Sequence, residues 1–179
     1  MAATLTLSLT ARRPAEAPQL RLERLYRSSR DDVYAYVASV LRDQSAAEDV
    51  TALAFERAFR GRGLFDPRRG SERAWLFGIA RNAALDELRR RKRSAATLGE
   101  QSAEDDAACT PEDAVLGRAT LRSALTELSA RERELIALKF HAGLSNREIA
   151  RVLGVSESNA GTLLHRTITK LRKACDEAI

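Results

Sequence analysis

The 179-residue chain has few aromatic residues, only two cysteines and no long apolar run. Aromatic residues make up 5% of the sequence, which argues against a β sandwich, because strands favour aromatic and β-branched side chains. No apolar stretch approaches the ~20 residues that cross a bilayer. Cys109 and Cys175 lie far apart, without histidine or cysteine at metal-ligand spacing. The sequence therefore predicts a reducing, cytoplasmic compartment and no metal site.

The sequence also has little of what an enzyme needs. It shows no carboxylate cluster, no nucleophile elbow and no phosphate-binding loop, so we predict no catalytic residue and no cofactor. An enzyme, such as a nuclease, remains an alternative, and a metal-dependent activity would favour it. Alanine, leucine and arginine dominate instead, a mixture that favours an all-α fold.

Charge is unevenly distributed along the chain, whose formal net charge is +5. The net charge is +1 in residues 1–20, +6 in 21–93, −6 in 94–117 and +4 in 118–179. Two basic regions joined by an acidic segment indicate a polyanionic partner, such as nucleic acid, held at two places. Two solvated helical domains with a disordered linker would have the same pattern, so charge alone leaves both interpretations open.

Apolar residues recur at helical spacing in the first half of the chain, and no strand or internal repeat is predicted. Residues 1–19 lack this period and are expected to form a mobile arm, followed by a helix from about residue 20 to residue 41. Ser45 and Glu48 are spaced as a capping box, which predicts that a second helix begins there. Glycine and proline make residues 61–70 a loop.

A third helix and a linker follow this loop. Ser71 is expected to cap the helix, which should end at about Arg91. Residues 94–110 are small, polar and acidic, which is typical of a flexible linker. Serine or threonine caps, two of them in capping boxes, predict four further helix starts: Thr110, Ser129 with Glu132, Ser145 with Glu148, and Ser156.

Residues 146–166 meet the physical requirements of a helix-turn-helix. Gly154 can adopt the positive φ of the tight turn, and Ala150 is small where two helices would cross. One arc of the last helix is apolar, whereas the other suits base edges and phosphates in a major groove. That polar arc consists of Ser158, Thr162, His165, Arg166, Thr169, Arg172 and Lys173. A plain helical hairpin with a solvated basic face is the alternative interpretation.

The helix that follows Ser71 carries a second polar arc beside its apolar one. Its members are Trp75, Asn82, Asp86, Arg89 and Arg93. A tryptophan can stack on a base, an asparagine can hold an unpaired base, and arginines can hold phosphates. Alternatively, Trp75 is a boundary residue of the core and the arginines complement the helix dipole. Neither alternative explains why both features occur beside a loop of glycine, proline and arginine.

Four motifs stand out by their order and spacing: Ala47-Glu48-Asp49-Val50-Thr51 with Phe55; Ala74-Trp75-Leu76 through Ile79-Ala80-Arg81-Asn82 to Asp86; Thr110-Pro111-Glu112; and Asn146-Arg147-Glu148-Ile149-Ala150 through Leu164-His165-Arg166. Together they resemble the motifs of bacterial sigma factors of the extracytoplasmic-function (ECF) class, in the sigma-70 family. The resemblance covers roughly residues 20–175.

The resemblance implies two helical domains, at 20–93 and 111–179, joined by the linker 94–110. The first resembles sigma region 2, which binds the clamp helices of the RNA polymerase core and opens the −10 element. Its expected polymerase contacts are Glu48, Asp49, Phe55 and Arg57. Its expected −10 DNA contacts are Phe65, Arg68, Arg69, Trp75, Arg81, Asn82, Asp86 and Arg89.

The second domain resembles sigma region 4, which binds the β-flap tip of the polymerase and reads the −35 element of promoter DNA. Its expected DNA contacts are Ser156, Ser158, Asn159, Thr162, His165, Arg166, Thr169 and Lys170. The resemblance also implies an anti-sigma factor as a regulatory partner, and no membrane insertion.

Two stretches depart from the family pattern. Ala52 and Leu53 stand where the family often has glutamine and an acid, which affects the expected clamp-helix contact. The family often has a bulky aliphatic residue followed by Lys-Ser-Arg on the reading helix, where this chain has Ala160-Gly161-Thr162-Leu163. This difference predicts a different promoter sequence or weaker binding to promoter DNA. A glycine at position 161 costs about 1 kcal/mol of helix propensity.

Two alternatives besides an enzyme stay open. One is a helix-turn-helix regulator that binds duplex DNA, usually as a dimer, without polymerase. The other is a degenerate sigma-like protein that binds polymerase or an inhibitor but does not initiate transcription. A sigma factor needs core polymerase to bind DNA, whereas the regulator does not, so a DNA-binding assay with and without core polymerase separates the two.

Overall fold

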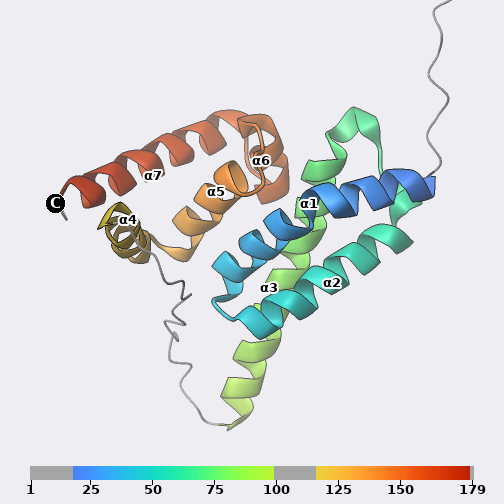
Figure 1. Cartoon of the computed structure of the whole chain (residues 1–179), viewed down its shortest axis with the longest axis horizontal. Helices are drawn as coiled ribbons and strands as arrows, with labels where there is room; N and C mark the ends of the chain where they lie inside the picture. Colours follow the sequence, from blue (N-terminus) through green and yellow to red (C-terminus); the bar gives the residue numbers. More distant parts are fainter. Residues whose placement is uncertain (1–17, 99–115, 178–179) are drawn as a thin grey trace, which may run out of the picture.

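The computed structural model describes residues 18–98 and 116–177 of the chain. The first half contains α1 (Pro18–Leu41), α2 (Gln44–Arg60) and α3 (Glu72–Leu98), and the second contains α4 (Leu116–Thr126), α5 (Ala130–Phe140), α6 (Asn146–Leu153) and α7 (Glu157–Glu177) (Figure 1). Two 3₁₀ turns, η1 (Arg62–Leu64) and η2 (Pro67–Arg69), fill the predicted loop between α2 and α3. The described residues include no strand, and the expected all-α class with two helical domains is confirmed.

The first half is a three-helix unit in which α1 and α2 lie side by side and α3 packs across them (Figure 1). Its interior is filled by alanine, valine and leucine together with two fully buried aromatic side chains, Tyr36 and Phe77. Their rings meet edge to face with centroids 5.5 Å apart, a favoured arrangement for aromatic pairs. This interior holds α3, and therefore its polar arc, in a fixed orientation.

The second half is ordered by helix caps that the sequence predicts. Ser129 and Glu132 form a reciprocal capping box at the start of α5, and Ser145 and Glu148 form another at the start of α6. Each box satisfies backbone donors that a helix start otherwise leaves unpaired. At the start of α7, the Ser156 hydroxyl accepts a hydrogen bond from the Asn159 backbone N–H at 3.2 Å. These predicted helix starts are confirmed.

The start of α2 differs from the prediction. Asp43, not Ser45, is the cap: its side chain accepts a 3.0 Å hydrogen bond from the Ala46 backbone N–H. Arg42 has a φ of +52°, which turns the chain out of α1 and leaves Asp43 in an extended conformation suited to a cap. Ser45 therefore lies inside the helix, and the Ser45–Glu48 capping box was wrong.

The helix α3 is longer than predicted, because it ends at Leu98 and not near Arg91. The residues at 94–98 contain two alanines and neither glycine nor proline, so nothing in them stops a helix. The first five residues of the predicted linker, 94–98, therefore belong to the end of α3. The rest of it, with the Thr110 cap, lies outside the described residues, as do residues 1–17 of the predicted arm.

The two halves pack against each other. α1 contacts α5, and α3 contacts α6, and buried apolar residues from both halves form one continuous cluster. Within it, Leu135 and Leu138 of α5 are as fully buried as Val33 and Tyr36 of α1. Among the described residues, none of the helices combines the length and the apolar character needed to cross a bilayer.

Candidate nucleic-acid interface

The α6–α7 pair has the geometry of a helix-turn-helix. Gly154 ends α6 with φ 70° and ψ 35°, the left-handed conformation that the turn requires. Ile149, Ala150 and Ala160 are buried where the two helices meet. The small side chains of the two alanines let the helices approach each other, which leaves the outer side of α7 facing solvent.

The outer side of α7 carries the predicted −35 contacts. All of them are exposed: Ser156, Ser158, Asn159, Thr162, His165, Arg166, Thr169 and Lys170. The hydroxyls of Thr162 and Thr169 donate to backbone carbonyls one turn earlier, each at 3.0 Å. Their oxygens are left to accept hydrogen bonds, which a base donor such as the amino group of adenine or cytosine can supply.

Lys170 is placed differently from the rest of this face. Its Nζ donates to the Glu127 carbonyl and to the Glu132 carboxylate, both at 3.1 Å. The pKa of Glu132 lies below its ordinary value, first because the Ser129 backbone N–H donates to it and then because of Lys170. Lys170 thus ties α7 to the start of α5.

The glycine at position 161 departs from the family pattern on this same helix. A Cβ added there would lie 3.6 Å from the Asn146 side-chain nitrogen, which is ordinary van der Waals contact. Gly161 is therefore not required by crowding between α6 and α7. Its effect is to lower the helix propensity of α7 close to the reading face.

The loop between α2 and α3 is anchored on Trp75. The Phe65 ring lies 5.7 Å from the Trp75 ring, and the Arg21 guanidinium lies 4.9 Å from the centroid of Phe65. Phe65 and Trp75 are half-buried as a result, whereas Arg68 and Arg69 are exposed in η2. The loop therefore presents two arginines beside a partly exposed aromatic pair.

The middle of α3 carries the exposed amide of Asn82 and a carboxylate, Asp86, that pairs with two arginines. Asn82 and Asp86 are exposed, one turn apart. The Asp86 carboxylate accepts from Arg57 of α2 at 3.2 Å and from Arg89 at 3.3 Å. One expected polymerase contact and two expected DNA contacts thus form a single ion-pair cluster across α2 and α3.

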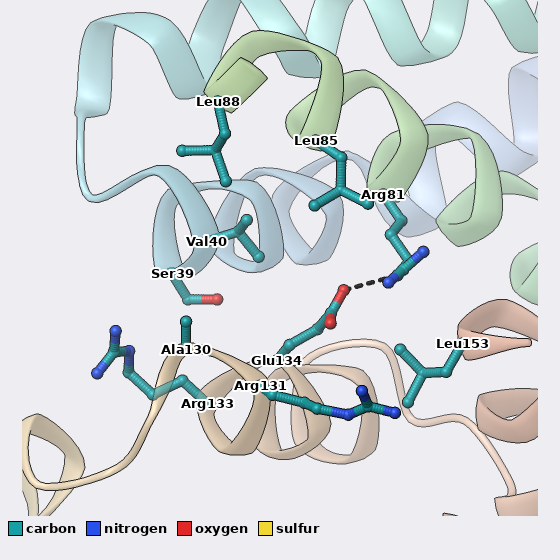
Figure 2. A pocket seen from close by; sticks show the side chains of 10 residues that line it. All are labelled: Ser39, Val40, Arg81, Leu85, Leu88, Ala130, Arg131, Arg133, Glu134 and Leu153. Atoms are coloured by element: carbon teal, nitrogen blue, oxygen red, sulfur yellow. Dashed lines mark hydrogen bonds and ion pairs between the residues drawn. The ribbon is translucent and has the colours of Figure 1, made fainter. Parts of the chain in front are cut away.

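Arg81 faces the other half of the chain. Its Nε donates to the Glu134 carboxylate of α5 at 2.7 Å, and the two side chains are only 22% and 13% exposed (Figure 2). The Tyr36 hydroxyl donates to the same Glu134 oxygen at 3.2 Å. Burial, and then the negative charge of Glu134, raise the pKa of Tyr36 well above its ordinary value, so this hydroxyl keeps its proton.

The remaining expected polymerase contacts lie on α2. Glu48 and Asp49 are exposed near its start, on the side away from the core. Phe55 is 8% exposed and packs edge to face on Tyr26, with ring centroids 4.8 Å apart. Phe55 therefore orients α2 on α1, while the two carboxylates are available to a partner.

The basic end of α3 is ordered by a carboxylate. Glu87 accepts from Arg90 and Arg91 at 2.8 Å, and these hydrogen bonds lower its pKa from 4.5 to about 2. Arg91 also donates to the α2 cap, Asp43, at 2.9 Å. The run of basic residues is thus partly fixed in position. Across the described ranges, no group of three or more histidine, cysteine or acidic side chains is arranged to hold a metal ion.

Comparison with known proteins matches two family models to the chain. Sigma-70 region 2 matches residues 25–94, and Sigma-70, region 4 matches residues 118–171. The ECF RNA polymerase sigma factor SigL of Mycobacterium tuberculosis is 32% identical over 166 residues, which cover 91% of this chain and 92% of SigL. The chain belongs to the ECF sigma factors of the sigma-70 family. It is a transcription initiation factor, of the kind that binds RNA polymerase and directs it to promoters.

One further relative and one solved structure are also similar to this sigma factor. The ECF sigma factor BldN of Streptomyces coelicolor is 36% identical over 154 residues, which cover 84% of this chain but only 58% of BldN. The sigma factor RpoE of Bartonella quintana, solved in complex with the anti-sigma factor NepR, has the same fold. It matches 87% of this chain and 97% of its own with a TM-score of 0.74 and 22% identity.

Sequence reasoning missed the polar residues that join the two halves of this sigma factor. Arg73 donates to the backbone carbonyls of His141 and Ala142, and the Ser71 hydroxyl donates to Glu148. No local pattern indicates these contacts, because the partners lie about 70 residues apart in sequence. A helix period shows that Arg73 leaves the core face, but not what it meets.

Proposed function

We propose that this sigma factor binds RNA polymerase core, reads the −35 element with α7 and holds the melted −10 element with α3. The observation that carries the proposal is that one chain presents two separate polar faces. One lies on the outer helix of a helix-turn-helix, and the other lies on a helix that carries Trp75 of an aromatic pair and, two turns later, the exposed amide of Asn82. The first suits a duplex major groove, and the second suits unpaired bases.

On α7, the proposed roles divide by chemistry. Arg166 is exposed and can donate to a guanine edge or a phosphate. Thr162 and Thr169 act as acceptors, because their protons are held by the helix backbone. Replacing the usual Lys-Ser-Arg with Gly-Thr-Leu removes two cations, so phosphate contacts and their salt dependence are reduced.

On α3 and its loop, Trp75 supplies a stacking surface that Phe65 holds in place. Asn82 offers both a donor and an acceptor to a base that has left the stack. Arg68, Arg69 and Arg89 are placed to hold phosphates of the single strand. Leaving the stack costs a few kcal/mol, which stacking on Trp75 and hydrogen bonds to Asn82 would offset.

The polymerase contact is proposed for the exposed face of α2, through Glu48, Asp49 and Arg57, against the clamp helices. The second half would bind the β-flap. The two domains are proposed at 20–93 and 111–179, and the acidic segment 94–110 between them begins with the last five residues of α3. Two weak DNA contacts on one chain gain from effective concentration once the polymerase holds both halves at the correct spacing.

An anti-sigma factor is the proposed regulator. RpoE was solved with NepR, and CnrH, which is 26% identical with a TM-score of 0.62 over 89% of this chain, was solved with the cytosolic domain of CnrY. We also propose, from its membership of this family, that the factor acts in the cytoplasm and performs no catalysis of its own.

The test is run-off transcription with purified core polymerase on a library of barcoded promoters. We expect transcripts only when the factor is present, from templates that share one −35 and −10 pair. Arg166→Ala should lower the signal, whereas Arg122→Ala, at an exposed site on α4, is the matched control. Protection of duplex DNA without core polymerase would instead favour a conventional regulator, and binding to core without transcripts would favour a degenerate factor.

A further inference from the structure

A pocket lies among four helices, away from the polar faces of α3 and α7. It has a volume of about 250 Å³ and is lined by residues of α1, α3, α5 and α6. Sites for drug-sized ligands measure roughly 300–1,000 Å³, so this pocket fits a smaller molecule. Pockets between packed helices that combine an apolar lining with a few polar groups are frequent ligand sites. The chemistry of its walls therefore indicates what it can bind.

One wall of the pocket is aliphatic. Leu85 and Leu88 of α3 form it together with Val40 of α1, and Leu153 of α6 lies at one end (Figure 2). Leu88 is 36% exposed, and the other three are half-buried. Among the described residues that line the pocket, none is aromatic and none is glycine, so there is no ring to stack on a base and no glycine-rich loop to hold a nucleotide. This wall fits an alkyl chain, whose burial removes apolar surface from water.

The opposite wall is basic. Arg131, Arg133 and Glu134 of α5 line it, and Arg81 of α3 reaches Glu134 from the side (Figure 2). Three arginines and one carboxylate leave a formal charge of +2 at the pocket. A ligand with one negative group and an apolar body therefore matches both walls.

Arg131 is the arginine best placed to hold that negative group. Arg81 is already paired with Glu134 at 2.7 Å, and Arg133 donates to a backbone carbonyl. Arg131, by contrast, is exposed and makes no hydrogen bond or ion pair within the part of the chain that the structure describes. Its side chain runs along the pocket (Figure 2). A guanidinium forms two parallel hydrogen bonds with a carboxylate, which gives both affinity and orientation.

The start of α5 adds to the attraction for an anion. Ala130 is the first residue of this helix and lines the pocket. The amino end of a helix carries a partial positive charge, because its first backbone N–H groups have no partner within the helix. The capping box bonds the backbone N–H groups of Ser129 and Glu132, not those of Ala130 and Arg131. The helix end and the Arg131 guanidinium thus favour a negative group on the same wall.

We propose that this pocket binds a small aliphatic carboxylate, such as a medium-chain fatty acid, with its carboxylate on Arg131 and its alkyl chain against Leu85 and Leu88. A simple anion would leave the aliphatic wall uncovered, and a neutral alkyl compound would leave Arg131 unpaired. Apart from Arg81, no lining residue belongs to the proposed DNA or polymerase contacts. The inference therefore goes beyond the proposed function and does not depend on it. Because the ligand binds the folded chain, it also raises the free energy of unfolding.

The probe is sodium octanoate, titrated into the full-length factor and followed by calorimetry and by NMR of isotope-labelled leucine methyl groups. We expect saturable binding of one octanoate per chain and a rise in the thermal unfolding midpoint. The methyl signals of Leu85, Leu88 and Leu153 should shift. Those of Leu121, which is exposed on α4, should not. Acetate lacks the alkyl chain and octanol lacks the charge, so each should bind roughly tenfold more weakly.

Two variants each remove one side of the site. Arg131→Gln removes the cation, and Leu85→Phe fills space beside the aliphatic wall. Their matched controls are Arg122→Gln and Leu121→Phe on α4, which does not line the pocket. The octanoate affinity should fall roughly fivefold or more in each pocket variant and stay unchanged in both controls. Circular dichroism verifies the helix content, and Arg131→Gln, at an exposed site, decides the test if Leu85→Phe does not fold.

Three outcomes would overturn the proposal. One is the absence of saturable octanoate binding. Another is equal affinity in Arg131→Gln and Arg122→Gln, or a shift of the Leu121 methyl groups as large as that of Leu85, because octanoate would then associate with apolar surface in general. The third is acetate binding as tightly as octanoate, which would make the site one for simple anions. None of these results bears on the run-off test of the proposed function.

Discussion

The polar faces of α7 and α3 carry similar side chains but hold them in different ways. On α7, the exposed threonines are bonded to the backbone of their own helix. On α3, Trp75 packs on the loop, Asp86 pairs with α2, and Arg81 pairs with α5. Apart from Lys170, which pairs with the start of α5, the face of α7 is therefore a property of one helix, whereas the face of α3 depends on how the rest of the chain is folded.

The largest effect is expected where the α7 face depends on a turn. Gly154→Val puts a β-branched residue at φ 70° and should destabilise the second half by about 2 kcal/mol or more. Apart from its two neighbours in the chain, no residue places an atom within 4 Å of the added Cβ, so the cost is conformational. Thermal unfolding measures it. Gly154→Asn, which tolerates this conformation, should cost much less, and equal losses in both variants would contradict the explanation.

A second prediction contrasts one arginine from each face. Arg81→Ala leaves the carboxylate of Glu134 largely buried and should destabilise the chain by about 2 kcal/mol. Arg166→Ala, at an exposed site, should change stability by less than about 0.5 kcal/mol and act on −35 DNA instead. Urea unfolding beside run-off transcription checks both. If Arg81→Ala were as stable as the parent chain, the α3 face would depend on the rest of the fold no more than the α7 face does.

The basic end of α3 predicts a pH dependence. Because the folded pKa of Glu87 is lowered from 4.5 to about 2, its stabilising effect is complete above pH 4.5 and is lost as the pH falls through 2. Glu87→Gln should therefore destabilise the chain by up to about 1 kcal/mol at pH 7. The difference from the parent chain should shrink below pH 4.5 in unfolding measurements. A difference that stays constant down to pH 2 would contradict this role.

The smallest effect is expected at the glycine on α7. Gly161→Ala should stabilise the second half by about 0.5–1 kcal/mol, because the alanine Cβ meets only ordinary contact and favours the helix. Calorimetry of the two proteins measures the shift. A loss of stability would mean that α7 needs the glycine for close packing. Unchanged promoter preference would show that residue 161 affects the stability of α7 but not the promoter sequence that the helix recognises.

The sequence predicts best those parts of the fold that depend on local chemistry. The capping boxes at Ser129 and Ser145 and the turn at Gly154 are found where expected, because a cap or a left-handed glycine needs only its near neighbours. The cap of α2 was misplaced because Asp43 and Ser45 are both good caps two residues apart. The choice depended on the positive φ of Arg42, which no pattern indicates.

The candidate site is predicted less completely, for a related reason. Periodicity indicates that Asp86 leaves the apolar face of α3, and it is exposed; Arg81 is named as a site residue only by the resemblance to the family. It does not indicate that Arg81 meets Glu134, 53 residues later, or that Asp86 bridges to Arg57. Contacts between distant segments depend on how the helices pack, which the pattern of a single helix does not encode.

The most direct test of the account is permanganate footprinting of promoter DNA, which detects unpaired thymines, with core polymerase and this sigma factor together and separately. We predict reactive thymines at the −10 element only when both proteins are present, and their loss in Asn82→Ala while −35 protection remains. Reactive thymines with the Asn82→Ala variant at the level of the parent chain would contradict the assignment of melting to the α3 face.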